Sequence, residues 1–487
     1  MKRLSDILYG VPLKDLIGNP NLAIETLTMD SRKVRPFSLF FAHEGFTTDG
    51  HLFISDAISN GAAAVVCSKL PEQLEKNVTW IWVENTRSSM ALIAKNFFDN
   101  PSEKIKLIGV TGTNGKTTTT TLLYNLFSAL GFKCGLISTV RIVINGRSIP
   151  TTHTTPDLLR INELLAQMVA EECTHAFMEV SSIGVHQGRI DGLRFEGGIF
   201  TNITHDHLDY HGTFLNYLNC KKSFFDQLDP ESFALTNLDD PNGEVMLQNT
   251  RARCSGYSLH GKGKYTTKIK EMDFEGMLME INHNDVWVKL TGEFNAYNIL
   301  AVFGAASELD IEKSKILTVL SSLESVEGRF NVVPGHSGSC AIIDYAHTPD
   351  ALKNIIDSIR HVMKNKGRLI VVIGCGGNRD KEKRPLMGKL AAASGMAIFT
   401  SDNPRFEDPK QIIEDMKKGL TDEESSRVIT ILDRREAIKT AAAMLQPSDV
   451  LLIAGKGHED YQEIQGTKIP FNDKKEVAEA LKFKSIK

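Results

Sequence analysis

A glycine-rich turn between an apolar run and a helical pattern constrains this chain more than any other feature. The turn and helix start read Gly-Thr-Asn-Gly-Lys-Thr-Thr-Thr over residues 112–119, after the strand-like run 105–110. In such a unit, backbone N–H groups can close on phosphate oxygens, Lys116 supplies positive charge, and the Thr117 hydroxyl can ligate Mg²⁺. The general pattern G-x-x-x-x-G-K-[ST] fails by one position, because Val110 stands where its first glycine belongs. The alternative is a threonine-rich helix start with an exposed lysine, but the strand and helix context favours a phosphate-binding loop.

Length and composition limit the possible classes of protein. The chain has 487 residues, which corresponds to about three domains of ordinary size. Its charged fraction is 24% and its net charge is −4, so no general basic field favours nucleic acid or an acidic membrane surface. The seven cysteines are scattered without a C-x-x-C pair, which favours a reducing compartment. Neither a signal region nor an apolar run of about 18 residues occurs, so we expect a cytoplasmic protein without membrane insertion.

Short apolar runs alternate with helical patterns and divide the chain into three α/β regions. Residues 1–102 form a small first region that ends at an Asn-Pro-Ser turn. Residues 103–333 form a central region with the phosphate-binding loop, and residues 334–487 form the third. The stretch 334–339, rich in glycine and serine, is the expected linker between them. Strands separated by helix-length segments predict mostly parallel sheets.

Two polar side chains follow strand-like runs of the central region. Glu179 and His207 each come at or soon after the end of such a run. Because ligands of parallel sheets bind beyond the carboxyl ends of the strands, both are expected at the same edge as Lys116 and Thr117. A carboxylate at the end of a neighbouring strand is a usual partner of the Mg²⁺ that offsets phosphate charge. The sequence therefore predicts a magnesium site at this edge.

Three histidines within seven residues, His205, His207 and His211, leave two other interpretations open. Imidazole suits zinc better than magnesium, but no fourth zinc ligand is in view. The histidines could also be structural residues at a helix start, with Asp206 and Asp209 as capping residues. We expect at least one of the three to have only this structural role.

The third region contains three apolar runs that each end in a dense polar cluster. The runs are 368–373, 397–400 and 450–454. The first resembles a dinucleotide fingerprint, but Arg379 occupies the place of its third glycine, so that interpretation fails. Three such clusters in succession predict a binding crevice at the carboxyl edge of a sheet. Its mixed charges suit a zwitterion, with arginines for carboxylates and carboxylates for an ammonium group; the residues are Arg379, Arg405, Asp402 and Glu459.

Five motifs, in order along the whole chain, resemble the Mur ligase family. They are Gly-Thr-Asn-Gly-Lys-Thr-Thr (112–118), Asp-His-Leu-Asp-Tyr-His-Gly (206–212), Gly-Glu-Phe-Asn-Ala-Tyr-Asn (292–298), Asp-Tyr-Ala-His-Thr-Pro (344–349) and Gly-Lys-Gly-His-Glu (455–459). None is decisive alone, but the ordered set is very specific. Within the family, the chain is similar to members that add the third residue of the peptidoglycan stem peptide.

The resemblance implies a three-domain α/β fold. It gives a small N-terminal domain for a UDP-sugar, a central P-loop ATPase domain with a mostly parallel sheet, and a C-terminal Rossmann-like domain for an amino acid. The implied activity is an ATP- and Mg²⁺-dependent ligase of peptidoglycan precursor synthesis. It would join meso-diaminopimelate to UDP-N-acetylmuramoyl-L-alanyl-D-glutamate through an acyl phosphate. No nucleic acid is implied as a partner, and we expect a monomer.

The resemblance also assigns roles to individual residues of this sequence. The implied catalytic residues are Lys116, Glu179, His207 and Lys221. The implied metal ligands are Thr117, Glu179, His207 and Lys221, the last as a carbamate. The ATP-binding positions are Gly112, Thr113, Asn114, Gly115, Lys116, Thr117, Thr118, Asn295, Arg329 and Asp344. The UDP-sugar positions are Ser31, Thr154, Thr155, Ser181, Gln187 and Arg189. The diaminopimelate positions are Arg379, Asp402, Asn403, Pro404, Arg405, Gly455 and Glu459.

Some features of the sequence depart from the family pattern or leave alternatives open. Lys222 neighbours Lys221, so the carbamate position could differ by one residue. Ile183 and His205 replace a histidine and an arginine that many relatives carry. The alternative functions are a lysine-adding Mur ligase, a ligase like folylpolyglutamate synthase, a P-loop motor or switch, and a non-enzymatic binding protein. Arg405 favours diaminopimelate over lysine, because it can pair with the additional carboxylate.

Overall fold

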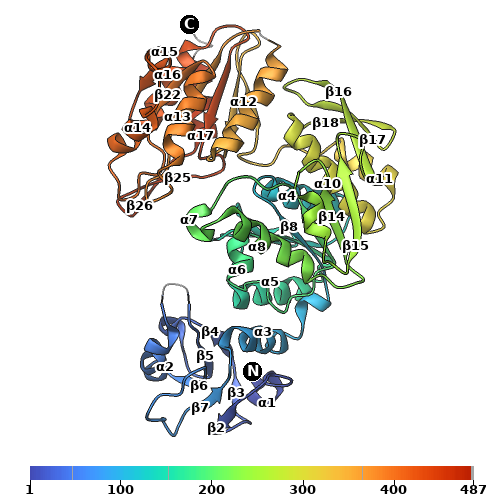
Figure 1. Cartoon of the computed structure of the whole chain (residues 1–487), viewed down its shortest axis with the longest axis vertical. Helices are drawn as coiled ribbons and strands as arrows, with labels where there is room; N and C mark the ends of the chain where they lie inside the picture. The colour runs from blue at the N-terminus through green and yellow to red at the C-terminus, as the bar shows by residue number, and fades with distance from the viewer. Residues whose placement is uncertain (46–47, 152, 365, 484–487) are drawn as a thin grey trace.

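The computed structural model consists of three α/β bodies along one long axis (Figure 1). It describes residues 1–45, 48–151, 153–364 and 366–483. The three bodies contain a five-stranded, an eleven-stranded and a six-stranded sheet in chain order, which confirms the predicted α/β class. In the described part of the chain, no helix is both long and apolar enough to cross a membrane.

The first body is built on a small sheet of strand order β2-β7-β6-β5-β4, parallel except at β2. Its strands are β2 (Asp15–Ile17), β4 (Thr26–Thr28), β5 (Ser38–Ala42), β6 (Ala62–Cys67) and β7 (Thr79–Trp82). β1 (Lys2–Arg3) and β3 (Ala23–Ile24) pair separately. The helices are α1 (Leu4–Ile7), α2 (Ile54–Ser59) and α3 (Thr86–Phe97), with 3-10 turns η1 (Ser31–Lys33), η2 (Gly50–Phe53) and η3 (Pro101–Glu103).

The central sheet has the order β11-β10-β9-β12-β8-β13-β14-β15-β16-β17-β18 and is parallel from β9 to β16. Its first strands are β8 (Lys106–Thr111), β9 (Cys134–Ile137), β10 (Ile142–Ile144), β11 (Arg147–Ile149), β12 (His175–Glu179) and β13 (Gly197–Phe200). The remaining strands are β14 (Phe233–Asn237), β15 (Arg253–Ser258), β16 (Tyr265–Met272), β17 (Met277–Ile281) and β18 (Asn284–Val288). The helices are α4 (Lys116–Ala129), α5 (Leu158–Ala170), α6 (Ser182–His186), α7 (Leu208–His211), α8 (Phe214–Asp226), α9 (Gly243–Leu247), α10 (Glu293–Glu308) and α11 (Lys313–Leu320).

Helices cover both faces of the central sheet. Ile108 and Val110 of β8 belong to the core cluster formed with α4 and α10, whereas Leu107 belongs to the cluster formed with α5 and α8. A parallel strand that is buried on both faces reads as a continuous apolar run. The run before the phosphate-binding loop is therefore the buried strand at the middle of this sheet.

The third body has a sheet of order β19-β20-β24-β21-β22-β23, parallel except at β19. Its strands are β19 (Asn331–Pro334), β20 (Cys340–Asp344), β21 (Leu369–Ile373), β22 (Met396–Phe399), β23 (Val428–Thr430) and β24 (Val450–Ala454). The separate hairpin pairs β25 (Tyr461–Ile464) with β26 (Thr467–Pro470). The helices are α12 (Pro349–Met363), α13 (Lys383–Ala393), α14 (Pro409–Lys417), α15 (Asp422–Ser426), α16 (Arg434–Met444) and α17 (Asp473–Phe483).

The stretch expected as a linker is instead a turn inside the third sheet. Strands β19 and β20 pair antiparallel, and the Gly335 N–H donates to the Ser339 carbonyl at 2.8 Å. Glycine and serine favour tight turns as well as linkers, and here they form the turn of a β-hairpin. Strand β19 spans the expected domain boundary at 333–334.

Specific polar contacts join neighbouring bodies. Arg87 of α3 pairs with Asp191 at 3.2 Å, which joins the first body to the central one. On the other side, Asp350 in the first turn of α12 accepts hydrogen bonds from Asn114 Nδ2 at 2.9 Å and Thr204 Oγ1 at 3.3 Å. The phosphate-binding loop therefore contacts the third body directly.

Candidate active site

The phosphate-binding loop joins the carboxyl end of β8 to the start of α4. Gly115 caps α4 with φ of 86°, in the left-handed region that favours glycine. A Cβ at this position would also lie 2.5 Å from Asn298 Oδ1 on α10. The Asn114 backbone N–H donates to Asn202 Oδ1 at 2.9 Å, which fixes the loop from the end of β13. The loop thus has the predicted strand–turn–helix form.

Lys116 points back into its own loop. Its Nζ donates to the carbonyls of Gly112 and Thr113 at 2.9 and 2.8 Å. Burial lowers the pKa of Lys116, while the nearby Glu179 and Asp206 carboxylates act in the opposite direction. An anion that enters the loop can therefore replace two carbonyl acceptors of this ammonium group.

Lys221 reaches the same loop from α8. Its Nζ donates to the Gly112 carbonyl at 2.8 Å and lies 4.6 Å from the ring centroid of Tyr217. Burial and the Lys116 charge hold the pKa of Lys221 well below its ordinary value. Lys222 instead pairs with Asp226 at 2.7 Å. Of the two adjacent lysines, the structure brings Lys221 to the phosphate-binding loop.

The predicted magnesium ligands surround Lys116 from three elements. Glu179 ends β12, and its carboxylate accepts from Thr139 N at 2.7 Å and Thr139 Oγ1 at 3.1 Å. The Thr117 hydroxyl accepts from Arg329 Nη2 at 3.2 Å. Burial lowers the pKa of His207, with opposing influence from the adjacent Asp206. Hydroxyl and carboxylate oxygens are the donors that Mg²⁺ prefers, so this donor set fits the ion.

The histidines at 205, 207 and 211 do not form the zinc site considered above. The His205 ring lies 5.2 Å from Phe214, and His207 Nε2 is 3.6 Å from Asp206. His211 Nε2 forms a 3.0 Å hydrogen bond with Ser182 Oγ, and burial lowers its pKa to about 4. Among the described residues, these rings do not belong to any group of convergent metal ligands.

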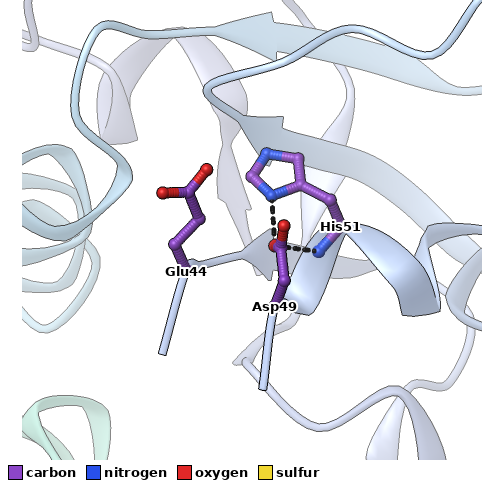
Figure 2. A group of neighbouring side chains, drawn as sticks. All are labelled: Glu44, Asp49 and His51. Atoms are coloured by element: carbon purple, nitrogen blue, oxygen red, sulfur yellow. Dashed lines mark hydrogen bonds and ion pairs between the residues drawn. The ribbon is translucent and has the colours of Figure 1, made fainter. Parts of the chain in front are cut away.

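In a second group of possible ligands, in the first body, two of the three members already pair with each other (Figure 2). It consists of Glu44, Asp49 and His51. His51 Nδ1 is 2.7 Å from Asp49 Oδ1, and its Nε2 accepts from the Ser68 backbone N–H at 3.2 Å. Glu44 pairs with Lys69 at 2.6 Å. Both imidazole nitrogens are therefore engaged in holding two loops together.

A cavity of about 1020 Å³ lies between the central and third bodies. Its lining includes the phosphate-binding loop and residues along the whole length of α12. The predicted nucleotide residues that line it are Asn114, Gly115, Thr118, Arg329 and Asp344. Asn295 does not line the cavity, but its Oδ1 accepts a hydrogen bond at 3.1 Å from Nδ2 of Asn298, which does. The size and position of the cavity suit a nucleotide.

Arg329 and Asp344 form the side of this cavity that belongs to the third body. The Arg329 guanidinium lies 4.6 Å from the Tyr345 ring. Asp344 accepts from the backbone N–H groups of Phe330 and Ala346 at 2.8 and 2.7 Å. Burial nevertheless raises the pKa of Asp344. Its carboxylate thus fixes the start of the Asp-Tyr-Ala-His-Thr-Pro motif.

Most of the predicted UDP-sugar positions form one hydrogen-bonded cluster. Thr155 Oγ1 donates to the Glu179 carbonyl at 2.9 Å and lies 3.0 Å from Ser181 Oγ. Arg189 donates to Gln187 Oε1 at 2.6 Å and to the Thr155 carbonyl at 2.6 Å. Thr154 Oγ1 lies 3.0 Å from Thr139 Oγ1, which also contacts Glu179. Ser31 is separate, in η1 of the first body, where its carbonyl accepts from Asn60.

The third body carries a compact charged cluster beyond strands β22 and β24. Lys456 is fully buried, and its Nζ donates to Asn403 Oδ1 and Glu459 Oε2, both at 3.0 Å. Asn403 Nδ2 donates to the same Glu459 oxygen at 2.7 Å. Gly455 has φ of 111°, and a Cβ there would lie 2.6 Å from Asp402 Oδ2. The predicted amino-acid residues Asp402, Asn403, Gly455 and Glu459 are therefore neighbours.

The predicted arginines lie beside this cluster. Arg405 Nη1 donates to the Gly377 carbonyl at 2.7 Å, and Nε is 3.3 Å from Glu463. The Pro404 carbonyl packs against Gly377. Arg379 is exposed two residues beyond that glycine and makes no ion pair with a described residue. Both guanidinium groups thus belong to the loops that follow β21 and β22.

Several residues at the site were not assigned from the sequence. Lys456 was seen only as part of a motif, although it is the centre of the amino-acid cluster. Thr139, which holds Glu179, and Asp350, which holds Asn114, follow no recognisable sequence pattern. Arg384 is fully buried between the loops that carry the two arginines. Long-range pairing of this kind has no periodic signal in a single sequence.

Arg384→Met is expected to destabilise the third body by about 3–5 kcal/mol, because it leaves two carboxylates without their buried partner. Arg384 Nη1 contacts Glu407 at 3.0 Å and Asp415 at 2.9 Å. Hydrogen bonding to Arg384 lowers the pKa of Glu407 from 4.5 to about 2. A carboxyl group whose pKa is lowered in the folded protein stabilises the fold at pH values above its ordinary pKa. The stability difference between the wild-type protein and the variant should therefore disappear as pH falls from 4.5 to about 2. Hydrogen exchange of the backbone amides in β21 and β22 measures this difference in stability.

The matched control is Arg435→Met. Arg435 is 51% exposed and pairs with Glu476 at 2.9 Å, so its loss should cost less than about 1 kcal/mol. An Arg384 variant that loses the same stability at pH 7 and pH 2.5 would contradict the ion-pair explanation.

Comparison with known families agrees with the site. The family model for the Mur ligase family catalytic domain matches residues 23–98, that for the Mur ligase middle domain matches 110–306, and that for the Mur ligase glutamate ligase domain matches 328–457. The chain belongs to the Mur ligase family, and it is an ATP-dependent ligase of that class.

Similar proteins define the branch of the family. The UDP-N-acetylmuramoyl-L-alanyl-D-glutamate–2,6-diaminopimelate ligase of Phocaeicola vulgatus is 52% identical over 97% of this chain and 98% of its own. The ligase of the same name from Bacteroides fragilis is 50% identical over 98% of this chain and 99% of its own. A solved structure of a ligase with that name is 32% identical, with a TM-score of 0.71 and 99% coverage of both chains.

Proposed function

We propose that this protein joins meso-diaminopimelate to UDP-N-acetylmuramoyl-L-alanyl-D-glutamate in peptidoglycan precursor synthesis. A carboxylate of the UDP-sugar dipeptide attacks the γ-phosphorus of ATP, giving an acyl phosphate and ADP. The amine of diaminopimelate then attacks the acyl carbon, phosphate leaves, and the amine loses a proton. One observation carries the proposal: arginines lie beside ion-paired carboxylates at one sheet edge of the third body, and α12 of that same body contacts the phosphate-binding loop.

The first step brings two anions together, and residues of the central body would reduce their repulsion. Lys116 and the backbone N–H groups of residues 115–117 would hold the phosphates. Thr117, Glu179 and His207 would hold Mg²⁺, which supplies positive charge at the transferring phosphoryl group. Lys221 is the residue that would carry the carbamate. Arg329 and Asp344 would contact the nucleotide from the third body.

The remaining residues would bind the two organic substrates. The cluster of Thr154, Thr155, Ser181, Gln187 and Arg189 would bind the sugar dipeptide, and it contacts Glu179 directly through Thr155. Ser31 would bind the uridine end from the first body. We also propose domain limits near 102 and, in place of the expected 333, near 328, because β19 belongs to the third sheet. We further propose a monomer, and a cytoplasmic location, since the cysteines are unpaired in the described chain.

The amino-acid substrate distinguishes this proposal from the lysine-adding alternative. Diaminopimelate carries a carboxylate that lysine lacks. Arg405 lies on the loop after β22 and donates to the Gly377 carbonyl of the loop after β21. The same loop after β22 carries Asp402 and Asn403, and Asn403 contacts Glu459; the Asp402 and Glu459 carboxylates would hold the ammonium. A ligase with a folate-like substrate would not need the UDP-sugar-binding cluster at Thr155 or Ser31. The geometry therefore supports diaminopimelate best.

Phosphate release measured with purified protein tests the proposal. With ATP, Mg²⁺ and the UDP-sugar dipeptide, we expect rapid release only when meso-diaminopimelate is added. L-lysine should support a rate lower by roughly 10⁴, the discrimination reached when a buried polar group loses its partner. Equal rates with the two amino acids would overturn the substrate assignment. Full ATPase activity without any amino acid would overturn the ligase assignment.

A further inference from the structure

The buried ammonium group of Lys456 has no role in the reaction described so far. Lys456 follows Gly455 at the end of β24 and is 0% exposed. Burial of a lysine is costly unless carboxylates and hydrogen-bond acceptors surround it. Here the acceptors are Glu459 Oε2 and Asn403 Oδ1, both at 3.0 Å, and the Tyr461 ring centroid lies at 5.6 Å.

The contacts of Lys456 leave part of the same cluster open. Asp402 Oδ1 is 4.0 Å from Lys456 Nζ, beyond hydrogen-bond distance. Among the described residues, no donor forms a hydrogen bond with the Asp402 carboxylate or with Glu459 Oε1. Asp402 and Glu459 carry two negative charges against one from Lys456. The cluster therefore lacks one positive charge, which is the charge of a single substrate ammonium group.

We propose that Lys456 is a positioning residue that sets the charge of the amine-binding site. It fixes Asn403 and Glu459 before the substrate arrives, and its charge offsets one of the two carboxylates, so that the cluster binds one substrate ammonium group. This inference rests on the proposed function, because the ligand is the amino-acid substrate. Without Lys456, the two carboxylates would lose their common cation, and a nearby like charge favours uptake of a proton that would compete with the ammonium group.

Other groups that face the cluster are not expected to titrate near neutral pH. Burial raises the pKa values of Tyr345 and Cys375 to about 12 and lowers that of His458 to about 3. The buried Arg434–Asp473 ion pair lies behind the cluster, where Arg434 donates to the Ala454 carbonyl at 3.0 Å. A change in pH dependence between pH 6 and pH 8 would therefore report the carboxylates. The groups that face the cluster include Tyr345, Cys375, His458, Tyr461, Arg434 and Asp473, and Arg329 lies beyond Tyr345 and His458.

Steady-state kinetics of the full-length protein test the inference. In the wild-type protein, KM for meso-diaminopimelate should be constant from pH 8 to pH 6. In Lys456→Gln, which can still donate a hydrogen bond, KM should exceed the wild-type value and rise a further tenfold, roughly, toward pH 6. The kcat at saturation and the KM for ATP should change little. Lys456→Arg, which retains the charge, should restore a constant KM.

Controls separate this inference from the proposed function. Lys439→Met removes a lysine that is 52% exposed on α16 and should match the wild type. A wild-type protein that does not use meso-diaminopimelate contradicts the proposed function. A wild-type protein that uses it, with a Lys456→Gln variant of unchanged pH profile, contradicts the inference. If Lys456→Gln does not fold, a wild-type KM that itself rises tenfold toward pH 6 contradicts the inference.

Discussion

Lys116→Met should lower kcat for phosphate release about 10²–10³-fold with all three substrates present. Methionine retains much of the buried volume but removes the charge that faces the phosphates. Loss of one preorganised electrostatic contact to the transition state typically has an effect of this size. The ammonium of Lys116 already lies within the loop, held by the Gly112 and Thr113 carbonyls. Phosphate measured in quenched samples at saturating ATP gives kcat for the wild-type protein and for the variant.

The control for this variant is Lys315→Met in the same body. Lys315 is 65% exposed and 3.6 Å from Glu312, so its removal should leave kcat unchanged. A Lys116→Met protein that retains wild-type kcat would exclude phosphoryl transfer at this loop. Such a result would favour a protein that binds nucleotide precursors without acting on them.

Arg405→Met should reduce the preference for meso-diaminopimelate over L-lysine by roughly 10⁴ in kcat/KM. The guanidinium group is 20% exposed and makes its present contacts with Gly377 and Glu463. Bidentate pairing with a substrate carboxylate would be lost in the variant, while lysine never makes this contact. Competition assays with both amino acids measure the ratio directly. The KM for ATP should not change, because Arg405 lies on the loop after β22 and does not line the nucleotide cavity.

The matched control is again Arg435→Met, which removes an exposed arginine of the same body. A preference that survives in Arg405→Met would assign the additional carboxylate to another cation, for which the exposed Arg379 is the candidate. Arg405→Lys should give an intermediate preference, since lysine keeps the charge but not the planar pair of donors.

Much of the architecture could be predicted because it rests on short-range patterns. The buried strand before the phosphate-binding loop and the apolar runs that end in polar clusters both became strands of parallel sheets. Parallel topology then brings the ends of those strands to one edge, which explains why Glu179 lies near Lys116. Polar clusters of this kind are therefore informative without an alignment.

The remaining features depend on contacts between distant residues. Asp350 and Asn114 are 236 positions apart, and nothing local to either predicts their hydrogen bond. The turn at 335–339 has the composition of a linker, and only the pairing of β19 with β20 shows that it closes a hairpin. Lys456 has a similar explanation, since its buried ammonium group depends on Asn403, which comes from the loop after β22. In each of these cases, contacts between residues far apart in the sequence determine the structure.

The carbonyl oxygen of Gly112 receives hydrogen bonds from two lysines, Lys116 at the start of α4 and Lys221 on α8. Two amines in one dry site repel each other when both are charged, and burial penalises each charge as well. In the protein without ligand, these two effects therefore lower the free energy of unfolding. An anion between the two amines removes that penalty. The ligase should therefore be more stable with an anion bound than without one. Its free energy of unfolding should depend on the nucleotide concentration as well as on its own sequence.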